Sequence, residues 1–412
     1  MAISILGAAA CREKGVGVTT RLIAAAIAAL ALIALAGATG SYAARTAGTI
    51  KIAALCDVSG PTSDVGTGYC KGETDYMSYF NRKKGGFANK DKVALALQDY
   101  AYNVARALQL YSQLSEGAVA FLGWGTADTT ALSARITADK LPYLSASYAE
   151  QLTDPKETPY NFVGGTNYTA QTQIALKFIA RTPGHHEVAF FHHNSAFGTA
   201  PISGAQAYIE QKNLNIGWKS YPMISGSTSF DAQLLQAKDQ GADYIIIQNV
   251  PTPASILAKD VKRLGVNSRL VCLNYCGSEL WVKLAGAAVN GALAVQPWTP
   301  VSYKVPGMKI PDNYLKSRGS SLNKVGLTYL QGWYTAALLC EAINTVIKKK
   351  QALSGPNVKA ALETMPAFLT GGVSFPIKFN GSGNVAHDGM KGSRVYSIKN
   401  GKFVKAAGFL VP

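Results

Sequence analysis

Short apolar runs alternate with longer segments of helical periodicity from Thr49 onward. Runs of strand length that are rich in Val, Ile, Leu, Ala and Phe, set between helical segments, are typical of a parallel sheet covered on both faces. The first part of the chain therefore predicts a βαβ series with strands at Ile50–Leu55, Val93–Gln98, Ala118–Gly123 and Pro142–Ser145 and helices at Gly66–Asn81, Ala101–Leu114 and Thr129–Lys140.

The same alternation restarts after Thr166 and predicts a second parallel sheet. Its strands are expected at Glu187–His192, Trp218–Met223, Tyr244–Gln248, Arg269–Leu273 and Gly291–Val295, and its helices at Thr169–Arg181, Gly198–Gln211, Phe230–Gln240, Thr252–Leu264 and Glu279–Ala285.

The end of the chain must rejoin these two series. Helices are expected at Leu327–Lys348 and Gly355–Thr364, and Asn400-Gly401 between strand-like runs predicts a hairpin. The long helix has no sheet of its own, so we expect it to pack on the first series. The predicted fold class is α/β, with two doubly wound Rossmann-like lobes: residues 44–165 plus 299–382 form lobe 1, and residues 166–298 plus 383–412 form lobe 2.

Residues 1–43 have the pattern of an export signal. Arg12, Lys14 and Arg21 precede the uncharged run Leu22–Gly37, and small residues follow up to Ala43. A basic region, an apolar region and a small-residue cleavage site together predict a signal peptide. The alternative is a membrane anchor, but the run is shorter than the roughly 20 residues that a spanning helix needs. We therefore expect an exported, periplasmic protein.

The charge of the chain is strongly basic, with 40 Lys and Arg against 24 Asp and Glu and a formal net charge of +16. The basic residues are scattered, and no basic patch interleaved with aromatic residues is present of the kind that grips nucleic acid. We interpret the charge as a solvated surface that helps to steer anionic solutes. Nucleic acid is not an expected partner.

Export permits disulfides, and the cysteines are spaced to form them locally. Cys56 and Cys70 flank the loop after the first strand, and Cys272 and Cys276 flank another loop. Cys340 lies in an apolar helical run and is expected to be a buried thiol. A zinc site at Cys272 and Cys276 lacks a matching Cys or His motif nearby.

Motifs for catalysis or cofactor binding are absent from the sequence. It contains no hydrolase nucleophile elbow, zinc-protease helix, P-loop or dinucleotide fingerprint. His192 and His193 are adjacent on a predicted strand, so their rings point to opposite faces and do not chelate one metal. We expect one of them to be inward and the other exposed. No catalytic residue, cofactor or metal is therefore predicted, and the chain is not expected to be an enzyme.

Loops at the carboxyl ends of the strands are the expected place for a ligand, because open α/β sheets bind there. The segment Trp124–Thr129 opens a helix, so its free amide groups and the hydroxyls of Thr126 and Thr129 suit a carboxylate. The alternative is ordinary helix capping by Thr126 or Asp128. Asp128 would repel a carboxylate, or it would meet a ligand ammonium.

Several short motifs occur in the order and spacing of one known family. They are Ser59-Gly60-Pro61, Phe121-Leu122-Gly123, Pro142–Ala146, Ala189–His192 and Phe197-Gly198. Across essentially the whole chain after residue 43, this order resembles the leucine/isoleucine/valine-binding protein family. The resemblance implies the type I periplasmic binding protein fold, with two lobes joined by three crossovers near residues 164–166, 296–300 and 380–388.

The resemblance also implies where a ligand lies. The family's carboxylate-holding loops match Thr126–Thr129 and the segment Ala146, Ser147 and Tyr148, and its lobe 2 aromatic matches Phe197. A second family aromatic falls on Val250, and the acidic residue that pairs with the ligand ammonium falls on or near Asn274. A buried ammonium without a carboxylate partner is costly.

These two departures predict an aromatic or aliphatic acid without an α-ammonium. Trp124, Tyr148, Phe197 and Tyr275 lie on the candidate loops and could stack on a ring. The alternative is that Asp128 takes the ammonium and the ligand is an amino acid.

The expected function is that of a monomeric periplasmic substrate-binding protein of an ABC importer. It would close two lobes around a small carboxylate ligand and deliver it to the permease subunits in the inner membrane. The alternative from another class is an exported sensor domain for small amides or acids, because both use the same fold. A sugar-responsive repressor would need a DNA-binding helix pair where residues 1–43 have an apolar run.

Overall fold

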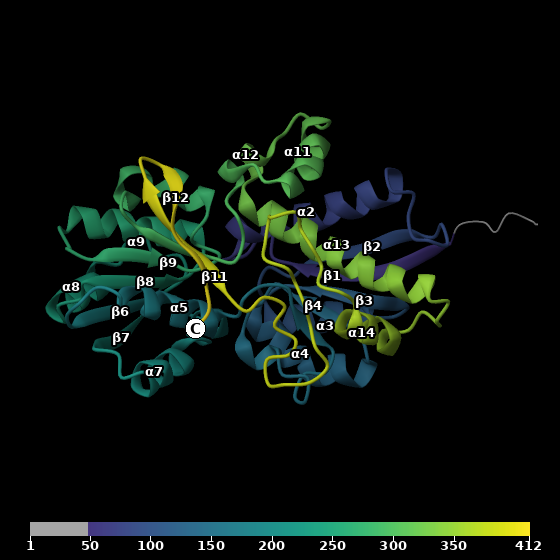
Figure 1. The fold of residues 1–412 in the computed structure, drawn as a ribbon, viewed down its shortest axis with the longest axis horizontal. Coiled ribbons are helices and arrows are strands. Elements are labelled where there is room, and N and C mark those ends of the chain that lie inside the picture. Colours follow the sequence, from purple (N-terminus) through teal and green to yellow (C-terminus); the bar gives the residue numbers. More distant parts are fainter. Residues whose placement is uncertain (1–47) are drawn as a thin grey trace, which may run out of the picture. The chain divides into compact units, whose positions relative to one another are not determined.

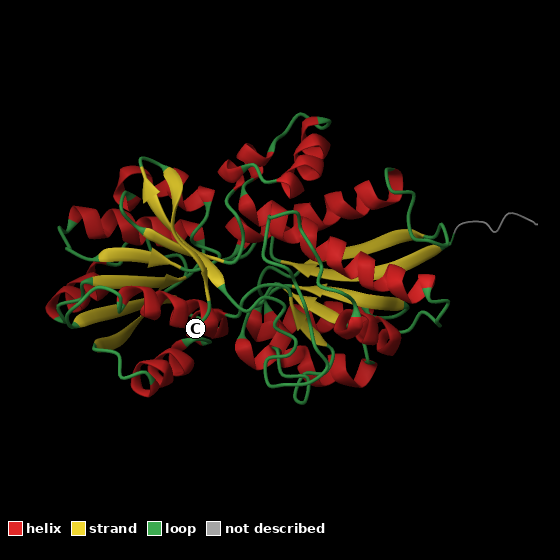
Figure 2. Ribbon diagram, viewed as in Figure 1, coloured by secondary structure: helices red, strands yellow, loops and turns green. Residues whose placement is uncertain are grey.

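The computed structural model describes residues 48–412, so the predicted signal peptide at residues 1–43 lies outside the described residues. The described chain builds two α/β lobes, each around its own sheet with helices on both faces (Figure 1, Figure 2). Within residues 48–412, no helix has both the length and the apolar character that a membrane span requires.

The sheet of lobe 1 is parallel and buried on both faces. Successive residues of its first strand enter different cores: Ile52 and Ala54 pack in one, Ala53 and Leu55 in the other. This explains the continuous apolar runs of the sequence. The strand order is β2-β1-β3-β4-β5, for β1 (Thr49–Cys56), β2 (Lys92–Asp99), β3 (Ala118–Gly123), β4 (Tyr143–Ser145) and β5 (Asn161–Val163).

Two long helices of lobe 1, α2 (Ser63–Arg82) and α13 (Leu327–Lys348), pack with their backbones in contact (Figure 1). A Cβ atom at Gly72 would lie 2.1 Å from the carbonyl oxygen of Tyr329, so only glycine fits there. Helix α13 therefore returns to lobe 1. Further helices of this lobe are α3 (Val104–Leu114), α4 (Thr126–Asp139) and α14 (Gly355–Thr364).

The sheet of lobe 2 is mixed, in the order β12-β11-β10-β9-β8-β6-β7. The hairpin turns at Asn400 and Gly401, which both have positive φ, and pairs antiparallel with β10. The parallel strands are β6 (His186–His193), β7 (Ile216–Met223), β8 (Tyr244–Gln248), β9 (Arg269–Cys272) and β10 (Leu293–Gln296), and the hairpin is β11 (Ser393–Lys399) and β12 (Lys402–Leu410).

The helices of lobe 2 differ from the sequence prediction at one point. The helix expected at Gly198–Gln211 is two helices, because Pro201 has no N–H to continue the first one. The helices are α5 (Tyr168–Ile179), α6 (Ala196–Thr199), α7 (Ile202–Gln211), α8 (Asp231–Asp239), α9 (Pro251–Arg263) and α10 (Glu279–Ala285), followed by the short turn η2 (Gly286–Val289).

The segment between β10 and α13, where the sequence predicted no helix, contains short helices. In α11 the side chains of Tyr314 and Leu315 are buried while Ile310 is 50% exposed. The helices of this segment are short and lie among Pro and Gly residues, so the segment was not recognised as helical. The elements are η3 (Val301–Tyr303), η4 (Pro306–Met308), α11 (Lys309–Lys316) and α12 (Leu322–Val325); η1 (Glu150–Leu152) is a further short turn after β4.

Two of the crossovers between the lobes are bonded to each other. Thr166 Oγ1 donates a hydrogen bond to the carbonyl oxygen of Gly392 at 2.6 Å, and Asn167 Nδ2 donates to Asp388 Oδ2 at 2.8 Å. Burial raises the pKa of Asp388 to about 8. Hydrogen bonds thus join these two chain connections.

Candidate functional site

A small cavity of about 20 Å³ lies where the strand-end loops of the two lobes meet. Its position at the carboxyl ends of both sheets is the usual ligand position in open α/β sheets. It is lined from lobe 1 by Thr62, Val65, Tyr102, Trp124, Gly125, Thr126 and Ala146, and from lobe 2 by Tyr168, Phe197, Val250 and Tyr275.

Hydroxyl groups form the polar part of the lobe 1 wall. Thr126, the first residue of α4, shares a hydrogen bond with Ser147 between their Oγ atoms at 2.6 Å. Behind them, Thr129 Oγ1 donates to the carbonyl oxygen of Gly125 at 2.6 Å and lies 3.1 Å from Ser145 Oγ. These four hydroxyl groups are buried. Of the four, only Thr126 lines the cavity, where it places its hydroxyl and the N-terminus of α4, an arrangement that suits an anion.

Asp128 does not line the cavity. Its carboxylate accepts hydrogen bonds from the hydroxyl of Tyr100 at 2.8 Å and from the backbone N–H of Gly125 at 3.2 Å. Burial raises the pKa of Asp128 to about 6, and these hydrogen bonds oppose that rise. Asp128 therefore supports the start of α4 from behind, as a capping residue does.

Asp57 organises the loop between β1 and α2. Its buried carboxylate accepts hydrogen bonds from the backbone N–H of Gly60 at 2.5 Å and from the N–H and the hydroxyl of Thr62 at 2.8 and 2.6 Å. Thr62 Oγ1 in turn accepts a hydrogen bond from Trp124 Nε1 at 2.9 Å. This chain of bonds fixes the indole of Trp124 at the edge of the cavity.

Aromatic side chains surround the small cavity. Tyr275 lies with its ring centroid 5.5 Å from that of Tyr148 and 6.3 Å from that of Trp124. Tyr168 and Phe197 pack edge to face at 5.3 Å. The hydroxyl of Tyr275 donates a hydrogen bond across the cleft to the carbonyl oxygen of Ala146.

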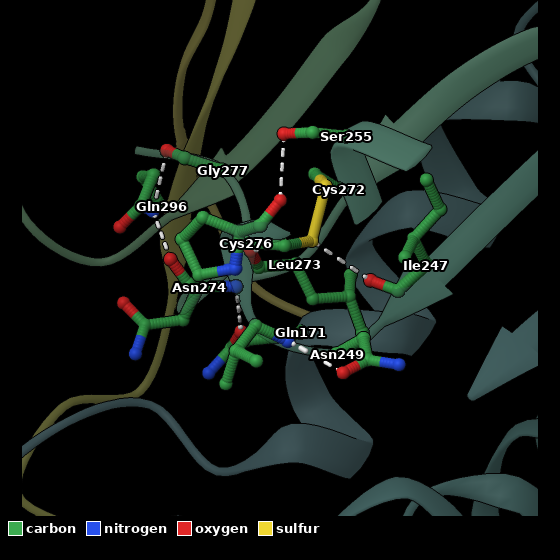
Figure 3. Close-up of a disulfide and its surroundings, with 12 residues drawn as sticks. Gln171, Ile247, Asn249, Ser255, Cys272, Leu273, Asn274, Cys276, Gly277 and Gln296 are labelled. Carbon is green, nitrogen blue, oxygen red and sulfur yellow. Dashed lines mark hydrogen bonds between the residues drawn. A yellow bond between two sulfur atoms is a disulfide. The ribbon is translucent and has the colours of Figure 1, made fainter. Parts of the chain in front are cut away.

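Asn274 lies beside the cavity in a buried group of neutral amides (Figure 3). Its Oδ1 atom accepts from Gln331 Nε2 on α13 at 2.9 Å, and its backbone N–H donates to Gln171 Oε1 at 2.9 Å. Its carbonyl oxygen accepts from Gln296 Nε2. Asn274 is therefore an uncharged amide that other amides hold behind the lobe 2 wall.

The cysteines pair within their own loops. The Cys56–Cys70 disulfide joins the end of β1 to α2, and the Cys272–Cys276 disulfide closes the loop that carries Asn274 and Tyr275 (Figure 3). Cys340 is a free, buried thiol. Cys56, Cys70 and Glu73 have potential metal-ligating atoms within 4.8 Å of one another, but the disulfide takes both sulfur atoms.

The expectation that one of His192 and His193 is exposed is wrong, because both side chains are buried. β6 lies inside the sheet of lobe 2, and Tyr102 of lobe 1 covers His193 with a centroid separation of 6.0 Å. The ring of His193 bonds to Ser195 and Ser225 at 2.8 and 3.1 Å. Burial lowers the pKa of His193 to about 4.

The structure brings about half of the proposed ligand-binding residues to the cavity. Trp124, Thr126, Ala146, Phe197, Val250 and Tyr275 line it, whereas Asp128, Thr129, Ser147, Tyr148 and Asn274 lie behind the lining.

Sequence reasoning missed Thr62, Val65, Tyr102, Gly125 and Tyr168 as lining residues. Tyr102 follows β2, so the rule of strand-end loops could have found it. Thr62 and Val65 open α2 beyond the loop that was considered, and Tyr168 opens α5 directly after a crossover. The sequence has no local pattern that turns these helix starts toward the cavity.

A protein-family model described as periplasmic binding protein matches residues 49–402 of this chain. The leucine-, isoleucine-, valine-, threonine- and alanine-binding protein of Pseudomonas aeruginosa is 23% identical over 289 residues, which cover 69% of this chain and 74% of that protein.

Solved structures share the fold over most of the chain. A branched-chain amino acid ABC transporter protein from Thermus thermophilus with bound valine superposes with a TM-score of 0.83 at 25% identity, covering 89% of this chain and 97% of that one. An ABC transporter substrate-binding protein from Aeropyrum pernix gives 0.80 at 26% identity, with 89% and 97% covered. A fatty acid ABC transporter substrate-binding protein from Thermomonospora curvata gives 0.78 at 17% identity, with 89% and 93% covered.

Proposed function

The chain belongs to the periplasmic binding protein family, and on that premise we propose that it captures a small carboxylate ligand between its lobes and delivers it to the permease of an ABC importer. The observation that carries the choice of ligand is the asymmetry of the cavity. Lobe 1 contributes buried hydroxyl donors at the start of α4, and lobe 2 contributes apolar and aromatic side chains.

A carboxylate is favoured by the donors around Thr126. The hydroxyl of Tyr168 faces the Thr126 side chain, and the hydroxyl of Tyr102 faces the backbone N–H of Thr126. Charge-assisted hydrogen bonds from such groups, together with the helix N-terminus, can hold an anion without a buried cation.

An α-ammonium is disfavoured because the acceptors nearest to the cavity either are already bonded or carry no charge. The carbonyl oxygen of Ala146 accepts from Tyr275, Asp128 accepts from Tyr100 and Gly125, and Asn274 is neutral. Within residues 48–412, no carboxylate side chain lines the cavity. The proposed ligand is therefore an aromatic or aliphatic acid without an α-ammonium, unlike the amino acids that name the Pseudomonas and Thermus proteins.

A thermal-shift screen tests the ligand class. The panel should contain leucine and valine, aromatic acids, branched and straight-chain aliphatic acids, and short amides. A ligand present at about 100 times its dissociation constant stabilises the folded state by about 2.7 kcal/mol. We expect acids that lack the ammonium group to give the largest shifts. A panel in which only amino acids stabilise the protein would overturn the ligand class.

Loss of uptake tests the transport role. A strain that lacks this chain should lose high-affinity uptake of the radiolabelled acid found in the screen, and expression of the chain should restore it. Normal uptake combined with loss of a transcriptional response to the same acid would identify the chain as a sensor instead.

A further inference from the structure

Tyr275 is a lobe 2 side chain of the cavity whose hydroxyl donates a hydrogen bond to the backbone of lobe 1, at the carbonyl oxygen of Ala146. Its side chain is only 6% exposed. The ring lies among Tyr148, Trp124 and Phe197, with centroid separations from 5.5 to 6.3 Å. Tyr275 thus fills the space between the lobes and spans the cleft at the same time.

The loop beneath Tyr275 is held rigidly on several sides (Figure 3). The Cys272–Cys276 disulfide closes it, and the backbone N–H of Gly277 donates to the carbonyl oxygen of Leu273 at 2.9 Å. Gln296 Nε2 also donates to the carbonyl oxygen of Gly277 at 2.8 Å. A side chain on such a support loses little entropy when it makes a cross-cleft contact.

The volume that Tyr275 leaves free is too small for an organic ligand. A cavity of about 20 Å³ has room for about one water molecule. An aromatic ring or a branched aliphatic chain can enter only if Tyr275 leaves its place, either by a rotamer change or by separation of the lobes. The hydrogen bond to Ala146 must then break.

We propose that Tyr275 is a built-in occupant of the ligand cavity, which latches the lobes together and is displaced when a ligand binds. This inference rests on the proposed function only for the chemistry of the displacing ligand. Because of the latch, a fraction of the molecules is closed before any ligand is added. Closed molecules do not bind ligand, so the apparent affinity falls in proportion to the fraction of molecules that are open.

Small-angle X-ray scattering of the purified protein tests the latch without any ligand. The protein should be freed of bound solutes by unfolding in guanidinium and refolding. We expect the Tyr275→Ala variant to have a larger radius of gyration than the wild type, with Tyr275→Phe between them. Identical scattering from all three proteins would overturn the latch.

Tyr221 provides the control, because it is a buried residue whose hydroxyl donates to Gln240 Oε1 within lobe 2 at 3.0 Å. Tyr221→Phe removes the same group from a hydrogen bond within one lobe without touching the cleft. It should leave the radius of gyration unchanged. An equal increase in Tyr221→Phe and Tyr275→Phe would show that the effect is not specific to the cleft, and would overturn the latch.

The sign of the affinity change separates an occupant from an ordinary ligand contact. If Tyr275 competes with the ligand, Tyr275→Phe removes one neutral hydrogen bond of the competitor and should tighten 3-phenylpropanoate binding about fivefold. Weaker or unchanged binding in Tyr275→Phe would overturn the inference while the ligand class stands. If the wild type binds leucine but not this acid, the ligand class fails, and the scattering result still decides the latch.

Discussion

The two walls of the cleft are built by different means. In lobe 1, Asp57, Thr126 and Ser147 are tied into short hydrogen-bond chains that leave their polar groups in fixed positions. In lobe 2, Phe197 and Val250 present apolar surface, and Asn274 is held by other neutral amides. One wall is therefore suited to orient a charged group, and the other to cover an apolar body.

This difference bears directly on ligand selection. Hydrogen-bond donors that are already in position replace the water that a carboxylate loses on binding, and they need no rearrangement when the ligand enters. A wall without charge offers nothing to an ammonium group, whose burial unpaired is costly. Selection against amino acids then resides in lobe 2, and the following predictions test the two walls against each other.

The largest effect is expected from Asp57→Ala. The substitution leaves the N–H groups of Gly60 and Thr62 and the Thr62 hydroxyl without their acceptor, which should lower the free energy of unfolding by about 3–5 kcal/mol. The lobe 2 control is Asn249→Ala, since Asn249 Oδ1 accepts only from the N–H of Val250, at 2.8 Å. That control should cost about 1 kcal/mol. Urea unfolding measures both values, and equal losses would contradict the contrast between the walls.

The disulfides should contribute unequally to stability. The Cys56–Cys70 bond has a sequence separation of 14 and the Cys272–Cys276 bond one of 4. Loop-closure entropy predicts about 3 kcal/mol for the first and about 2 kcal/mol for the second. Paired Cys→Ser variants compared by denaturant unfolding give both values. A larger loss from the Cys272 and Cys276 pair would show that its loop does more than the chain-entropy model allows.

Two substitutions that hardly change side-chain volume test the different roles of the two walls: Thr126→Val in lobe 1 and Val250→Thr in lobe 2. Thr126→Val removes a donor to the proposed carboxylate and strands Ser147 Oγ, so affinity for the acid should fall about tenfold or more. Val250→Thr changes the apolar wall and should alter affinity less than the first variant does. Calorimetric titration of both variants with the same acid checks the order, and the reverse order would contradict the assignment.

The pH dependence of the free energy of unfolding should show the ionisation of the Asp128 carboxyl group. Its pKa in the folded protein, about 6, lies above the usual value, so ionisation opposes folding. Its contribution is most favourable below the unfolded pKa of about 4 and is lost as the pH rises through about 6. From pH 7.5 to pH 5, the wild type should gain about 1 kcal/mol relative to Asp128→Asn. A constant difference between the two proteins across this range would contradict the prediction.

The fold was more predictable than the site. Most strands of the two sheets were evident because their apolar runs are buried on both faces, but the three-residue strand β5 (Asn161–Val163) was not predicted. The helix at Leu327–Lys348 begins and ends where its periodicity does. The helices around Tyr314 were missed because they are short and lie among Pro and Gly residues. Local patterns show which residues are buried, and they fail where burial depends on a second lobe, as it does for His193 and Tyr168.

The lining residues of the cavity were likewise predictable only where the local sequence determines their position. Trp124 and Phe197 were found because they follow strands, at a place that topology dictates. Asp128 was placed in the site for its charge, but its hydrogen bonds to Tyr100 and Gly125 turn it away from the cavity. The bond to Tyr100 joins residues distant in sequence and has no signature in the local sequence pattern. The bond to Gly125 is local, and it corresponds to the helix capping that the sequence offered as the alternative.

The most direct test of the proposed ligand class is a calorimetric comparison of ligand pairs that differ only in the α-ammonium group. The pairs are 3-phenylpropanoate with phenylalanine and 4-methylpentanoate with leucine. Burial of an unpaired charge costs about 2–5 kcal/mol, so the acid of each binding pair should be favoured by about 30-fold or more. Tighter binding of phenylalanine or leucine than of its deamino counterpart would contradict the account.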